Sequence, residues 1–123
     1  MSLDIWLPLL TVSEANMREH WAVKAKRKKQ HTQVAAMLTR SAFSGVVGKP
    51  PLPLCITLTR YGSRRLDPDN LAGSFKGIQD GIAKALGVDD GDERLTWVYD
   101  QEKGCVDLGV RVSIERKAKG ATG

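Results

Sequence analysis

The most regular pattern in the chain lies near its C-terminal end, where apolar and polar residues alternate over residues 105–115. The apolar members of this alternation are Val106, Leu108, Val110, Val112 and Ile114. Successive side chains of a β-strand point to opposite faces of the sheet, so a period of two predicts a strand with one buried face. We therefore expect the protein to contain a sheet, with residues 105–115 as one of its strands.

Three shorter segments predict further strands, at residues 4–10, 52–60 and 94–100. Pro8 places the first of them toward an edge of the sheet, because proline cannot donate to the hydrogen-bond ladder. A turn at residues 101–104 is expected to join the last two strands as a hairpin.

Two segments predict helices. Residues 18–42 contain neither proline nor glycine. Their second half has an apolar stripe at Val34, Met37, Leu38 and either Ala42 or Phe43, whereas the first half has none. Asp67 followed by Pro68 is typical of a helix start, and Gly87 of a helix stop. The second helix is expected to run to about Leu86, with its core stripe at Leu71, Phe75, Ile78, Ile82 and Ala85 or Leu86.

These segments predict a single small α/β (α+β) domain, with a mixed sheet of about four strands and two helices in the order βαβαββ. The domain is expected to span residues 1–115, and residues 116–123 form a polar basic tail that we expect to be disordered. A length of 123 residues suits one domain with one core. The two cysteines form no CxxC pair, and no apolar run is long enough to cross a membrane. We expect a cytoplasmic protein with reduced thiols and no membrane association.

The charges are divided along the chain. Residues 18–40 carry seven basic side chains against one acid, and residues 67–107 carry ten acidic side chains against four basic ones. The net charge of +5 favours a polyanionic partner. A surface that attracts phosphates has a reason to carry clustered carboxylates if these hold a divalent metal ion.

The residues best suited to chemistry lie between Arg64 and Asp92. Two aspartates, Asp67 and Asp69, flank the start of the second predicted helix, and Asp89 and Asp90 follow its end. On one continuous helix, Asp69, Lys76 and Asp80 would share a row opposite the apolar stripe. Carboxylates suit Mg²⁺, a lysine can stabilise charge on a phosphate, and Asn70 could orient a carboxylate or a water.

Each of these features also has an ordinary structural explanation. A DxD sequence is more often a cap and turn, and two aspartates before a glycine usually form a solvated turn. Lys76 and Asp80, four residues apart, usually make a weak surface ion pair. The four consecutive basic residues 26–29 are usually a solvated surface.

The combination of Arg64-Arg65, Asp67, Asp69-Asn70-Leu71, Lys76 and Asp89-Asp90 resembles the RusA family of Holliday-junction resolvases, small phage or prophage endodeoxyribonucleases. The likeness is strongest over residues 60–100 and extends loosely to Asn16-x-Arg18. The spacing from Asn70 to Lys76 is longer than in the best-known member, as though residues 72–74 were inserted.

The resemblance implies that Asp67, Asp69 and Asp90 bind Mg²⁺, for which Mn²⁺ substitutes, and that Lys76 is catalytic. The choice between Asp89 and Asp90 stays open. The resemblance also implies a homodimer that makes paired nicks, and one acidic cluster per chain argues for the same two-fold arrangement. The residues expected to contact the backbone of branched DNA are Arg18, Lys24, Lys26, Arg27, Lys28, Lys29, Arg64 and Arg65.

The sequence thus predicts a Mg²⁺-dependent endonuclease that resolves four-way DNA junctions in recombination and repair, in a bacterial host cell. Two alternatives stay open. One is a non-catalytic nucleic-acid-binding protein of phage origin, in which the acids only cap a helix and close turns. The other is a metal-dependent nuclease that acts on other branched DNA, such as flaps or forks.

Overall fold

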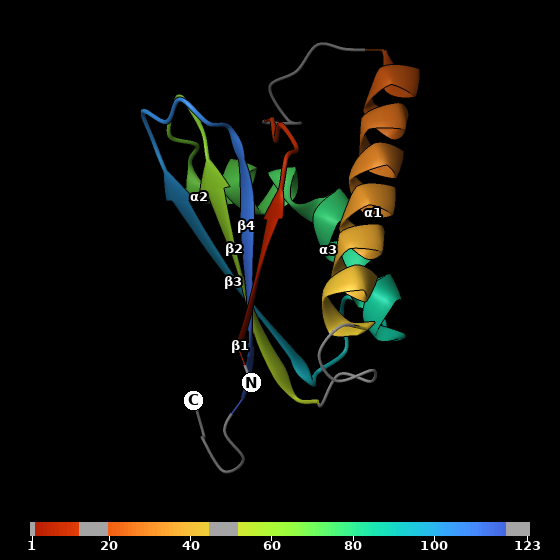
Figure 1. The fold of residues 1–123 in the computed structure, drawn as a ribbon. Coiled ribbons are helices and arrows are strands. Elements are labelled where there is room, and N and C mark those ends of the chain that lie inside the picture. Colours follow the sequence, from red (N-terminus) through yellow and green to blue (C-terminus); the bar gives the residue numbers. More distant parts are fainter. Residues whose placement is uncertain (1, 13–19, 45–51, 118–123) are drawn as a thin grey trace.

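A four-stranded mixed sheet with helices on one face forms the protein, as a computed structural model shows (Figure 1). The structure describes residues 2–12, 20–44 and 52–117. Within these residues the elements are β1 (Ser2–Leu7), α1 (Trp21–Ser44), β2 (Leu54–Tyr61), α2 (Pro68–Ser74), α3 (Lys76–Leu86), β3 (Leu95–Glu102) and β4 (Gly109–Arg116). The predicted α+β class is confirmed.

The strands lie in the order β1-β4-β2-β3. β4 is antiparallel to both of its neighbours, and β2 and β3 run parallel. The edge position predicted for the first strand is confirmed. The hairpin predicted at residues 101–104 is wrong, because β2 lies between β3 and β4. The two strands are neighbours in sequence, but each forms its ladder with β2 instead.

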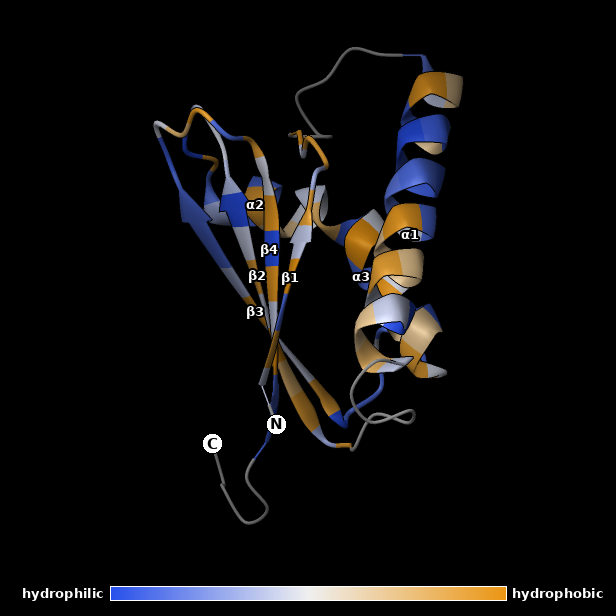
Figure 2. Ribbon diagram, in the orientation of Figure 1, coloured by the Kyte–Doolittle hydropathy of each residue, from blue (hydrophilic) through white to orange (hydrophobic). Residues whose placement is uncertain are grey.

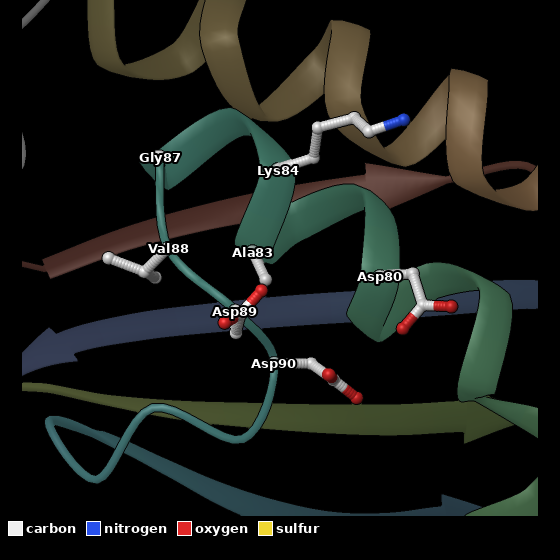
Figure 3. A pocket seen from close by; sticks show the side chains of 7 residues that line it. All are labelled: Asp80, Ala83, Lys84, Gly87, Val88, Asp89 and Asp90. Atoms are coloured by element: carbon white, nitrogen blue, oxygen red, sulfur yellow. The ribbon is translucent and has the colours of Figure 1, made fainter.

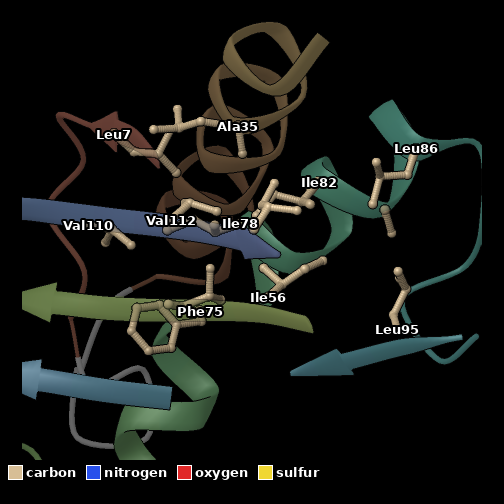
Figure 4. Close-up of a cluster of buried hydrophobic side chains, with 14 of the residues drawn as sticks. Leu7, Ala35, Ile56, Phe75, Ile78, Ile82, Leu86, Leu95, Val110 and Val112 are labelled. Carbon is tan, nitrogen blue, oxygen red and sulfur yellow. The ribbon is translucent and has the colours of Figure 1, made fainter. Parts of the chain in front are cut away.

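The core lies between the sheet and the helices (Figure 4). Val110, Val112 and Ile114 of β4 have no exposed surface, as the alternation predicts. The start of the predicted strand is wrong, because β4 begins at Gly109 and Val106 is 95% exposed. An alternating pattern selects one face of a strand, but it does not mark where the ladder begins.

The second predicted helix is divided at Phe75. This residue, with φ −94° and ψ −1°, ends α2 and precedes α3. Its ring is fully buried and stacks on Tyr99 of β3, with 5.8 Å between the ring centroids. Leu71, Ile78, Ile82 and Leu86 are buried with it, so the predicted core stripe is confirmed. The helix stop at Gly87 is also confirmed, because this residue has a left-handed φ of 77°.

The first helix packs against α3 through its middle turns, from Lys28 to Ala36. Ala35, Ala36 and Phe43 of α1 are buried, whereas Met37, which the sequence placed in the core stripe, is 59% exposed. Glycines of α3 let the two helices approach closely: a Cβ added at Gly81 would lie 2.4 Å from the carbonyl oxygen of Thr32. After an apolar first turn, the next turns of α1 are strongly hydrophilic (Figure 2), and this end of the helix extends past the start of α3 (Figure 1).

Candidate functional site at the start of α3

Lys76, the first residue of α3, lies between two carboxylates. Its Nζ is 3.2 Å from Oδ1 of Asp80, one turn along the same helix. It also donates a hydrogen bond to Oδ2 of Asp90, in the loop between α3 and β3. The hydrogen bond to Asp90 raises the pKa of Lys76, and the same bond lowers the pKa of Asp90. Lys76 and Asp90 are therefore both charged at neutral pH.

The backbone of Asp90 is fixed by the edge strand of the sheet. The indole Nε1 of Trp97 in β3 donates a hydrogen bond of 2.8 Å to the carbonyl oxygen of Asp90.

Asp80, Asp89 and Asp90 share the lining of an open hollow of about 500 Å³ beside α3 (Figure 3). Of the two adjacent aspartates, Asp90 is the one that meets Lys76.

Asp80 also joins the site to α1. Its second oxygen, Oδ2, is 3.5 Å from Nζ of Lys28, so one carboxylate lies between a lysine of each helix. The four charges of this cluster, Lys28, Lys76, Asp80 and Asp90, come from two helices and a loop. Sequence reasoning placed Lys28 among DNA-contacting residues and did not predict its pairing with Asp80. No local pattern carries that signal, because the partners are far apart in the chain.

Asp67 and Asp69 lie at the N-terminal end of α2. Asp67 is the N-cap: Oδ1 accepts from the backbone N–H of Asn70 at 2.9 Å, and Oδ2 accepts from the Asn70 side-chain amide at 2.8 Å. Asp69 is exposed in the first turn of the helix, where a negative charge is favourable. The capping role predicted for Asp67 is confirmed, and its partner is Asn70.

The structure brings some of the predicted residues together and leaves others apart. Lys76 meets Asp90, but among the described residues no ion pair joins it to Asp67 or Asp69. The expected row from Asp69 to Lys76 assumed one continuous helix, and the break at Phe75 removes that assumption. Across residues 2–12, 20–44 and 52–117, no three His, Cys, Asp or Glu side chains form a group that could hold a metal ion.

The donor chemistry of the predicted ligands nevertheless suits Mg²⁺. This ion takes oxygen ligands, keeps several waters, and commonly uses only one or two carboxylates together with substrate phosphates. Asp69 and Asp90 are partly or fully exposed and present such oxygens. Asp67 already uses both of its oxygens toward Asn70.

The basic residues of the first predicted helix form an exposed face on α1. Lys26, Lys28 and Lys29 are exposed, while Lys24 and Arg27 are partly buried. Lys26, Arg27 and Lys29 line an open groove of about 600 Å³ on this helix. Arg64 and Arg65 are exposed in the loop before α2, and Arg18 lies outside the described residues. The solvated surface predicted for residues 26–29 agrees with this exposure.

The residues that the structure describes form no helix that is both long and apolar enough to cross a membrane. No family model matches the chain. A protein of Xylella fastidiosa (strain Temecula1 / ATCC 700964), described as an uncharacterized protein, is 37% identical over 78 residues. The match covers 61% of this chain and 51% of that protein, so the chain spans about half the length of its relative.

Proposed function

We propose that this protein is a Mg²⁺-dependent endonuclease that cuts branched DNA and resolves four-way junctions as a homodimer. The observation that carries the proposal is the contact of Lys76 with Asp90, beside the basic face of α1. Phosphodiester hydrolysis needs a cation that activates water and a positive group that stabilises charge on the phosphate. A lysine held beside a carboxylate is a suitable starting arrangement for both needs.

The carboxylates around Lys76 support this chemistry. Asp80 and Asp90 come from separate segments, and both direct an oxygen toward the same ammonium group. Lys76 is thus the counter-ion at a point where two carboxylates converge. In the proposed enzyme, Asp67, Asp69 and Asp90 would hold Mg²⁺, and Lys76 would contact the phosphate that is cut. When bound, the metal ion supplies Lewis-acid chemistry and an activated water.

The basic face of α1 supports binding of the DNA backbone. Contacts from lysine and arginine to phosphates position a duplex without reading its sequence. Arg64 and Arg65, exposed in the loop just before α2, add positive charge close in the chain to Asp67 and Asp69. Two copies of the chain would supply one such site for each of the two strands that a resolvase cuts. Such an enzyme would act on DNA in the cytoplasm of a bacterial host cell.

A cleavage assay on a synthetic four-way junction tests the proposal. The parent protein should nick two opposed strands in Mg²⁺ or Mn²⁺ and should stop when a chelator is added. Asp69→Asn should abolish cutting while junction binding persists or improves, since a charge that repels phosphate is removed. Asp107→Asn is the matched control, because Asp107 is exposed and lies outside the candidate site. Cutting by Asp69→Asn at the parent rate would refute the metal assignment.

A second candidate is a nucleic-acid-binding protein without catalytic activity. The observation that favours it is the cap of α2, where both oxygens of Asp67 are already hydrogen-bonded to Asn70. Such a protein would bind junctions equally well with and without Mg²⁺ and would cut none of them. A panel of junctions, flaps and forks separates the resolvase from a nuclease with another branched substrate, and analytical ultracentrifugation tests the homodimer.

A further inference from the structure

Arg60 occupies a position where the pattern of β2 requires an apolar side chain. Leu54, Ile56 and Leu58 precede it on the same face of the strand and have no exposed surface. Arg60 continues their alternation and is only 7% exposed. Placing a guanidinium in the core is costly because the charge loses its hydration. The same loss of hydration lowers the pKa of Arg60.

The partners of this guanidinium are neutral oxygens. Its Nε donates to the hydroxyl of Thr11 at 3.0 Å, and Nη1 donates to the carbonyl oxygen of Arg64 at 2.6 Å. No carboxylate of the described residues forms an ion pair with it. Gly62 lies directly against the guanidinium: a Cβ added there would be 2.2 Å from Nη1. The turn after β2 is therefore folded around the Arg60 side chain.

Gln101 repeats this arrangement on the adjacent parallel strand. It is the register partner of Arg60, so both side chains leave the ends of β2 and β3 on the same face. Its Oε1 accepts from the backbone N–H of Leu66 at 2.9 Å, and its Nε2 donates to the carbonyl oxygen of Leu66 at 2.7 Å. Together Arg60 and Gln101 hold the backbone at residues 64 and 66 by three hydrogen bonds.

We propose that Arg60 and Gln101 are positioning residues that hold the segment 64–69 in the conformation needed to contact DNA and metal. The inference rests on the proposed function, in which this segment supplies Arg64, Arg65, Asp67 and Asp69. A loop with several charged side chains has little apolar surface of its own to order it. Two polar side chains at the strand ends fix its backbone instead, at a cost to the stability of the core.

Because burying the Arg60 guanidinium is costly, the proposal predicts a specific result when Arg60 is replaced by an apolar residue. A buried guanidinium that no carboxylate compensates keeps the full cost of its lost hydration, so an apolar side chain of similar volume in its place should leave stability unchanged or raise it. If Arg60 served only the core, a methionine that continues the Leu54-Ile56-Leu58 alternation would be an adequate substitute. If it serves the loop, Arg60→Met should preserve global stability while the segment 64–69 loosens.

Limited trypsin digestion followed by mass spectrometry tests this directly, because trypsin cuts after Arg64 and Arg65. We expect Arg60→Met and Gln101→Leu to be cut there at least ten times faster than the parent, with no loss in the urea midpoint of Arg60→Met. Cutting after Arg94, in the turn before β3, is the internal reference. Gln79→Leu is the matched control, since it removes another buried amide, the one that donates to Tyr99 at 2.8 Å.

Junction cleavage is measured on the same variants. At least a ten-fold loss of rate, with a higher Mg²⁺ concentration needed for half-maximal cutting, is expected for Arg60→Met and not for Gln79→Leu. Unchanged cutting after Arg64 and Arg65, or a lowered urea midpoint for Arg60→Met, overturns the positioning role. If the parent cuts no junction, the proposed function fails while the trypsin result still decides whether Arg60 and Gln101 order the segment.

Discussion

Lys76 and Asp90 lie 14 residues apart in the sequence, and their side chains meet in a direct ion pair between the start of α3 and the loop before β3. Asp80, one turn along α3, forms a second ion pair with Lys76. The pair therefore ties the loop after α3 back to the start of that helix. We therefore expect the free energy of unfolding to depend on the charge of Lys76 and of Asp90.

Replacing Lys76 with methionine should lower the free energy of unfolding at neutral pH by less than about 1 kcal/mol, because solvent screens this partly exposed pair. The lowered pKa of Asp90 contributes stability above its ordinary value of 3.8, and this is lost as pH falls through the lowered pKa. The raised pKa of Lys76 stabilises the folded protein at pH values below the ordinary value of 10.5, and this stabilisation is lost as pH rises through the raised pKa.

The loss of unfolding free energy caused by Lys76→Met should therefore be largest between pH 3.8 and pH 10.5, the ordinary pKa values of the two groups. It should become smaller at lower and at higher pH. Urea unfolding of the parent and the variant at neutral pH and at about pH 2 measures it. A deficit of the same size at both pH values would mean that it comes from packing of the lysine stem, not from charge.

Gly81→Ala should destabilise the protein by about 1–3 kcal/mol, although alanine favours a helix more than glycine does. The added Cβ would lie 2.4 Å from the carbonyl oxygen of Thr32 and 2.9 Å from Cβ of Ala35, so α1 would have to move away. Gly73→Ala is the control: no atom lies within 4 Å of its added Cβ, and the change should be neutral or stabilising by up to about 1 kcal/mol. Thermal unfolding of the two variants should show shifts of opposite sign, or a shift for Gly81→Ala alone.

The N-cap of α2 separates a structural from a chemical role of Asp67. Asp67→Ala removes the acceptor for the backbone N–H of Asn70 and should cost about 1 kcal/mol of stability. Asp67→Asn keeps an acceptor and should cost only a few tenths of that. In a junction cleavage assay, however, both variants should be inactive if the carboxylate binds Mg²⁺. Full activity of Asp67→Asn would leave Asp67 as a cap alone.

The basic face of α1 should govern the salt dependence of DNA binding. Each phosphate that a lysine neutralises contributes about 0.9 to the slope of log K against log salt. The exposed residues Lys26 and Lys29 should together account for up to about two units, lost in the double change to glutamine. Lys28→Gln should have a smaller effect, because Asp80 already lies 3.5 Å from its Nζ. Lys103→Gln, outside this face, is the control, and an equal effect there would argue against α1 as the binding surface.

Local patterns in the sequence predicted which faces are buried. Leu54, Ile56 and Leu58 of β2 are core residues in the structure, and so are Val110, Val112 and Ile114 of β4. The Asp67-Pro68 start and the Gly87 stop also proved correct, because caps depend on neighbouring residues alone. The predicted hairpin after β3 was among the errors, since strand order depends on partners distant in the chain.

Two glycines, Gly73 of α2 and Gly77 of α3, illustrate the same limit. Because glycine has no side chain, the sequence leaves room for a large group to approach the backbone at both positions. In the structure the group near Gly77 is α1 itself, with Cβ of His31 2.9 Å from where a Cβ would be added, while the space beside Gly73 is open. Local sequence can show that room exists, but it cannot show what fills it.

The sequence by itself determined the α+β class, the buried faces and the chemical character of the segment from Arg64 to Asp92. These follow from periodicity, capping and charge, which act over a few residues. Only the tertiary structure decided that Lys76 meets Asp90, that Lys28 shares Asp80, and that Arg60 lies in the core and holds the loop before α2. Such contacts depend on how distant segments pack, and packing minimises the free energy of the whole chain and not of any single segment.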